Sequence, residues 1–122
     1  MTATQIHELN EKFQKSAVQL SELMPGGSLV QATSMVLRST RLIDEQFSKV
    51  LSASSELRFN QAIDKMEEEM DDVLFVLDQM EIANKKQQIS LINDFLKEGY
   101  DLISVYSKCL DFIIDQKVEK EE

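Results

Sequence analysis

The apolar residues near the C-terminal end of this 122-residue chain recur at alternating steps of three and four positions. The residues that keep this spacing are Ile89, Ile92, Leu96, Gly99, Ile103, Tyr106, Leu110 and Ile113. Side chains three and four residues apart lie on one face of an α-helix, and so regular a repeat is typical of the seam of a helix bundle. We therefore predict a long amphipathic helix that packs against other helices.

Three earlier segments show the same spacing. Their apolar seams are Ile6, Leu9, Phe13, Ala17, Leu20 and Leu23; Leu29, Ala32, Val36, Ser39, Ile43, Phe47 and Val50; and Phe59, Ala62, Met66, Met70, Val73, Leu77 and Met80. Pro25 with two following glycines, and the serine-rich stretch 52–55, favour turns between the segments. We predict an all-α fold, an antiparallel up-down-up-down four-helix bundle over residues 1–117, with a charged tail over 118–122.

Short polar residues at the segment boundaries predict where helices begin. In a capping box, a short polar side chain and a glutamine or glutamate three residues later each accept a hydrogen bond from the other's backbone N–H. Three pairs fit this pattern: Thr2 with Gln5, Ser28 with Gln31, and Asn84 with Gln87.

Composition and charge narrow the possible functions. The chain has 13 Lys and Arg against 22 Asp and Glu, and the net charge of −9 opposes binding to nucleic acid phosphates. The nearest approach to a basic patch, and so the possible nucleic-acid contact, is Arg38, Arg41, Lys49 and Arg58. No apolar run nears the ~20 residues of a membrane span and no signal-peptide pattern is present, so we expect a cytoplasmic protein without a membrane partner.

A second apolar stripe accompanies the seam of the last predicted helix. It consists of Leu91, Phe95, Leu102, Val105, Cys109 and Phe112. One apolar face is enough for a helix in a monomeric bundle, so the stripe has two explanations. The helix is wedged between two helices of its own bundle, or the stripe contacts a second copy of the chain.

Apolar residues also lie on the outer side of the third predicted helix. Leu57, Phe75 and Ile82 fall about 180° from its seam at 100° per residue. Three apolar residues on one outer line indicate a contact surface. The predicted interface is therefore Leu57, Phe75, Ile82, Leu91, Phe95, Leu102, Val105 and Phe112.

The same helix carries the acidic run Glu-Glu-Glu-Met-Asp-Asp at residues 67–72. Glu68 and Asp71 lie nearly opposite the seam, whereas Glu69 lies roughly 60° from it. The run is therefore mostly a solvated helix face, and only Glu69 reaches the edge of the core.

Residues 68–75, which read Glu-Glu-Met-Asp-Asp-Val-Leu-Phe, resemble a segment of the MazG-like all-α nucleoside triphosphate pyrophosphohydrolases. The resemblance implies that Glu69 and Asp72, one helical turn apart, are Mg²⁺ ligands. The family also needs a Glu-Glu-x-x-Glu motif on the preceding helix, and residues 44–48 read Asp-Glu-Gln-Phe-Ser. The last acidic position of that motif is missing.

A broader similarity runs from Leu29 to Ile113. It is carried by Leu37-Arg38-Ser39, Ile43, Ala53, Ser55, Arg58-Phe59, Glu69, Leu74 and the stretch Ile82 to Lys86. These positions resemble the four-helix bundle proteins of ribosomal RNA intervening sequences, a family that includes the accessory variability determinants of diversity-generating retroelements. The resemblance implies a ring-like homo-oligomer, a pentamer, and an accessory role beside an RNA or a reverse transcriptase. At residues 42–46, where the family usually has Ser-Ile/Val-x-x-Asn, this chain reads Leu-Ile-Asp-Glu-Gln.

No complete catalytic set is visible in the sequence. His7 is the one histidine and Cys109 the one cysteine, and neither has a partner that would make a nucleophile and base pair. We expect a non-enzymatic, self-associating scaffold or adaptor that needs no cofactor and has a possible protein partner. The alternative is a Mg²⁺-dependent pyrophosphohydrolase that uses Glu69 and Asp72.

Overall fold

A computed structural model describes residues 1–121, with side chains as far as Val118. This part of the chain forms four α-helices and no strand: α1 (Ala3–Leu23), α2 (Gly27–Ser52), α3 (Glu56–Asn84) and α4 (Ser90–Glu121). The predicted all-α class is confirmed. The first four residues of the predicted tail continue α4, and Glu122 lies outside the described residues. Over residues 1–121 no helix combines the length and the apolar character needed to cross a membrane.

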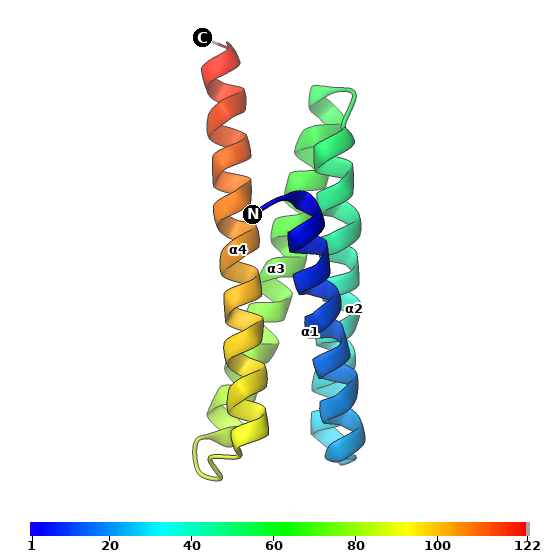
Figure 1. The fold of residues 1–122 in the computed structure, drawn as a ribbon, viewed down its shortest axis with the longest axis vertical. Coiled ribbons are helices and arrows are strands. Elements are labelled where there is room, and N and C mark those ends of the chain that lie inside the picture. The colour runs from blue at the N-terminus through cyan, green and yellow to red at the C-terminus, as the bar shows by residue number, and fades with distance from the viewer. Residues whose placement is uncertain (122) are drawn as a thin grey trace.

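Each helix packs against two others. The helix α1 contacts α2 and α4, and α3 contacts the same two helices. The α1–α2 and α3–α4 connections lie at one end of the molecule and the α2–α3 connection at the other (Figure 1). The core therefore runs along the axis between the four helices.

The helix caps match the prediction at α1 only. The backbone N–H of Thr2 donates to Oε1 of Gln5 at 2.8 Å, and the N–H of Gln5 donates to Oγ1 of Thr2 at 3.2 Å. The prediction at Ser28 is wrong, because the N-cap of α2 lies two residues earlier, at Gly26, which has no side chain to cap with. At α3, Oγ of Ser55 accepts from the N–H of Arg58.

The predicted cap at Asn84 is also wrong. This residue ends α3, and its side chain spans the turn into α4 instead. Its Oδ1 accepts from the N–H of Ile89 at 3.0 Å, and its Nδ2 donates to Oδ1 of Asn93 at 2.8 Å. A buried asparagine amide thus holds the α3–α4 turn, in which Gln88 adopts a positive φ of 51°.

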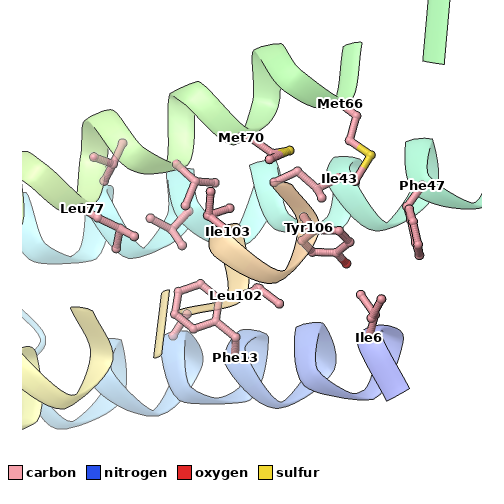
Figure 2. Packing of buried hydrophobic residues seen from close by; sticks show 14 of the residues in the cluster. Ile6, Phe13, Ile43, Phe47, Met66, Met70, Leu77, Leu102, Ile103 and Tyr106 are labelled. Carbon is pink, nitrogen blue, oxygen red and sulfur yellow. The ribbon is translucent and has the colours of Figure 1, made fainter. Parts of the chain in front are cut away.

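Side chains from all four helices converge in the core (Figure 2). The predicted seam positions of α4 from Ile92 to Leu110 are all buried, as are those of α3 from Ala62 to Met80. Two residues in the middle of the second stripe of α4 belong to the core as well: Phe95 is 3% exposed and Leu102 is 1% exposed. The ring of Phe95 packs edge to face on Phe13 of α1, with centroids 4.7 Å apart. Hence α4 is wedged between α1 and α3.

One polar group at the centre of the core was not predicted from the sequence. The fully buried side chain of Asn10 donates from Nδ2 to the carbonyl of Thr40 at 3.0 Å and to the hydroxyl of Tyr106 at 2.8 Å. Its Oδ1 accepts from Gln14 at 2.6 Å. Burial raises the pKa of Tyr106, so the phenol stays protonated and the network uncharged. The network joins α1, α2 and α4.

Close packing of α4 depends on Gly99. A Cβ atom at this position would lie 2.7 Å from Cδ1 of Leu77 and 3.0 Å from Cζ of Phe13, both in the core. These separations are shorter than van der Waals contact, so a larger residue would force Leu77 and Phe13, or α4 itself, to shift.

Substitution of Gly99 by alanine tests this close approach. Alanine in a helix interior is usually the more stable residue by about 1 kcal/mol. Here we expect Gly99→Ala to lower the free energy of unfolding by about 1–3 kcal/mol, because overpacking outweighs the gain in helix propensity. Urea denaturation measures the change. In a Leu77→Val background, which removes the Cδ atoms, the loss should shrink; an unchanged loss would contradict the proposed clash.

Candidate functional site

The most distinctive surface of the molecule is an uncharged groove between α2 and α3. We call it the neutral groove; it has a volume of about 440 Å³, and its lining residues include Leu29, Met35, Phe75, Val76, Met80 and Ile92. Ten of its fifteen lining residues are apolar and the other five are serine, asparagine or glutamine. Charged residues make up 29% of the chain, yet none lines this groove. The surface is therefore suited to an apolar, uncharged contact.

The groove has an exposed wall and a buried floor. Phe75 on α3 is 64% exposed, and Met35 on α2 is more than half exposed. Val76, Met80 and Ile92 are buried beside them. Exposed aromatic and methionine side chains over a buried apolar floor are the composition typical of a protein–protein contact.

The predicted interface residues have different outcomes. Leu57, Phe75 and Ile82 are exposed on α3, as predicted, but only Phe75 lines the neutral groove. On α4, Leu91 and Phe112 are exposed and Val105 is half-buried. Phe95 and Leu102 must be removed from the predicted interface, because their side chains are already used in the monomer core.

A second hollow, of about 510 Å³, lies between α2 and α3 and is lined in part by residues 52–54 at the α2–α3 turn. This turn is at the opposite end of the helix pair from the α1–α2 and α3–α4 connections (Figure 1). We call this second hollow the basic hollow; it is lined by Lys49, Arg58 and Lys65 together with serines, glutamines and alanines. The structure thus brings together two residues of the predicted basic patch, Lys49 and Arg58.

The remaining basic residues lie elsewhere or were missed. Arg41 lines a separate hollow between α1 and α2, next to Glu11 and Lys15, and Arg38 is exposed. Lys65 was not predicted as part of a basic site. Its position two helical turns after Arg58 places both on one face of α3, and this spacing is the signal that could have identified it.

The two carboxylates of the predicted metal site face different surroundings. Glu69 is buried, as its angle on the helix predicted, and Oε1 lies 3.4 Å from Nζ of Lys65. Asp72 is exposed. Across the part of the chain that the structure describes, no three His, Cys, Asp or Glu side chains are close enough together to hold a metal ion. A Mg²⁺ ion bound by Glu69 would compete with Lys65.

The segment expected to supply the other metal ligands is engaged with α1. Oδ2 of Asp44 lies 2.7 Å from Nδ1 of His7, and Nε2 of His7 lies 3.0 Å from Oε1 of Glu11. The hydrogen bond to Asp44 raises the pKa of His7, and the charges of Asp44 and Glu11 add to the effect. Cys109 is half-buried, and burial raises the pKa of its thiol. The surroundings of His7 are thus an ion-pair cluster and those of Cys109 a partly buried apolar stripe, and within the described part of the chain neither contains a partner for nucleophilic catalysis.

Comparison with known proteins assigns no family. No family model matches the chain, and no curated protein or solved structure matches it either. The neutral groove and the basic hollow are therefore the features that bear on function.

The buried carboxylate of Glu69 gives a test of the Lys65 ion pair. The side chain of Glu69 is 8% exposed, whereas Glu45, the partner of Lys49, is 58% exposed. We expect Lys65→Ala to lower the free energy of unfolding by about 1–3 kcal/mol, because a buried charge loses its partner. The control Lys49→Ala breaks an exposed pair worth about 0.5 kcal/mol or less. Equal losses in urea denaturation would contradict the assigned role of Lys65.

The His7 pair gives a test by pH. Because the folded-state pKa of His7 is raised, its pairing stabilises the fold at pH values below the ordinary 6.5 and is lost as pH rises through the folded-state value. His7→Gln should therefore lower the melting temperature at pH 6 and leave it nearly unchanged at pH 8.5. The effect is under about 1 kcal/mol, since His7 is exposed. Asp44→Asn should reduce the pH dependence to the smaller part that Glu11 contributes; an undiminished pH dependence would exclude Asp44 as the main partner.

Proposed function

We propose that this chain is a non-enzymatic scaffold or adaptor, an antiparallel up-down-up-down four-helix bundle that self-associates when a second copy covers the neutral groove. The observation that carries the proposal is the groove itself, which is uncharged in a highly charged chain and has Phe75 on its wall. The alternation of the helix connections between the two ends supports the antiparallel arrangement (Figure 1).

Charge favours the groove as the place where two copies meet. Each copy has a formal charge of −9, so contact through most of the surface would bring acidic groups together. The groove has no charged lining residue, and two copies joined there would not face carboxylate with carboxylate inside the contact. Added salt screens the remaining repulsion and should strengthen the association.

The shape of the groove favours a symmetric pair. A two-fold interface uses the same patch on both copies, so the patch must offer a projection and a recess together. Phe75 projects into solvent, and Val76, Met80 and Ile92 form the apolar floor. Burial of one exposed Phe or Met side chain contributes about 1.5–3 kcal/mol before the costs of association.

The pentameric ring implied by the family resemblance would need a further surface. A ring joins two different patches on each copy, and the groove supplies one. Leu91 and Phe112, both exposed on α4, are the candidates for the other. We propose the two-fold contact through the groove as the association that this chain's surfaces favour.

The test exploits two equally exposed phenylalanines. Phe75 lines the groove and is 64% exposed, whereas Phe112 on α4 is 62% exposed and lies outside the groove. We expect the unmodified chain to sediment as a dimer at micromolar concentration. Phe75→Ser should weaken dimerisation by about tenfold or more, because an interface anchor is removed. Phe112→Ser should leave the dimer intact.

Other outcomes of sedimentation equilibrium would contradict the proposal in distinct ways. If the chain stays monomeric at all accessible concentrations, the proposed self-association is wrong. Dissociation by Phe112→Ser as well as by Phe75→Ser would show a ring-type contact between two different surfaces instead of a symmetric pair.

A further inference from the structure

The basic hollow concentrates cations in a chain where anions predominate. Lys49 reaches it from α2, and Arg58 and Lys65 reach it from α3. The chain contains 22 acidic against 13 basic residues, yet none of the nine residues that line this hollow is acidic. The lining thus carries three positive charges and no negative one, and a cationic lining attracts anions. The carboxylates of Glu45, Glu68 and Glu69 lie beside the hollow, paired with Lys49 and Lys65.

The uncharged lining suits a phosphate-bearing anion. The hydroxyl of Ser54 and the side-chain amides of Gln46 and Gln61 can donate hydrogen bonds to anionic oxygens, whereas the hydroxyl of Ser52 already donates to the carbonyl of Ser48. No aromatic residue lines the hollow, so there is no surface on which a nucleic acid base could stack. The lining therefore offers contacts to charge and to oxygen, and none that would distinguish one base from another.

The present partners of these cations leave room for an anion. Arg58 takes part in none of the ion pairs formed among the side chains of residues 1–118. Lys49 pairs with Glu45 at 3.4 Å, and both side chains are largely exposed, so the pair is weak and can be exchanged. Lys65 is shared between Glu68 and Glu69 and stays anchored near the core.

We propose that the basic hollow binds a small polyphosphate anion, either inorganic or the phosphate chain of a nucleotide. Arg58 is the principal contact, because its planar guanidinium can donate two parallel hydrogen bonds to phosphate oxygens. Lys49 turns from Glu45 to the anion, and Lys65 adds positive charge at the inner side. The site lies away from the neutral groove, so it does not depend on self-association.

Calorimetric titration of the full chain with tripolyphosphate and, separately, with ATP tests the proposal in low-salt buffer without divalent cations. Both ligands should bind with similar affinity, and added salt should weaken both. We expect Arg58→Gln to weaken binding by about tenfold or more, as loss of hydrogen bonds to a charged group does. The control Arg41→Gln removes the same charge from a hollow that contains Glu11, and its affinity should stay within about twofold.

Three results would overturn the proposal. Absence of binding at about 1 mM tripolyphosphate would exclude a specific site. Equal weakening by Arg58→Gln and Arg41→Gln would show attraction to the whole molecule and not to the hollow. Binding of ATP without tripolyphosphate would show recognition of the base. Circular dichroism confirms that each variant is folded, and Lys49→Gln replaces Arg58→Gln if that variant unfolds.

Discussion

The close approach of α4 to α1 and α3 at Gly99 is the constraint on which the rest of the structure depends. Without a Cβ atom at this position, Leu77 and Phe13 can close over the helix. Phe95 and Leu102, one turn on either side, then pack into the core as a second apolar stripe. The side chains of Phe95 and Leu102 are thus used inside the monomer and are not available to a second copy, whereas an apolar recess stays open between α2 and α3.

The polar network at Asn10 adds specificity to a core that is otherwise apolar. Apolar seams of similar shape can slide past each other by one turn, about 5.4 Å, at little cost in buried area. Such a slip of α1 would separate Asn10 from the Thr40 carbonyl and the Tyr106 hydroxyl, and would leave buried donors and acceptors unpaired. The network therefore sets the register of α1 against α2 and α4.

The helical spacing was enough to predict four helices and the outward position of Phe75, because both follow from periodicity along a single helix. It could not decide which neighbour a second stripe faces, so Phe95 was wrongly placed at an interface. The sequence predicted a helix start at Asn84, because the local capping pattern does not show that the side-chain amide of this residue hydrogen-bonds to Ile89 after the turn. Asn10 and Met35 were missed for a related reason: their roles arise from partners on other helices, which only the packed structure brings together.

The neutral groove and the basic hollow lie at opposite ends of one helix pair, and this separation has a consequence for avidity. The helix α3 has 29 residues and is roughly 40 Å long, so it acts as a stiff spacer between the two surfaces. A symmetric pair joined at the groove would leave both hollows free. Such a pair is bivalent. Two linked hollows would raise the apparent affinity only for extended ligands or surfaces that present several anionic groups far apart. A single small anion can occupy one hollow at a time, so its affinity would not change.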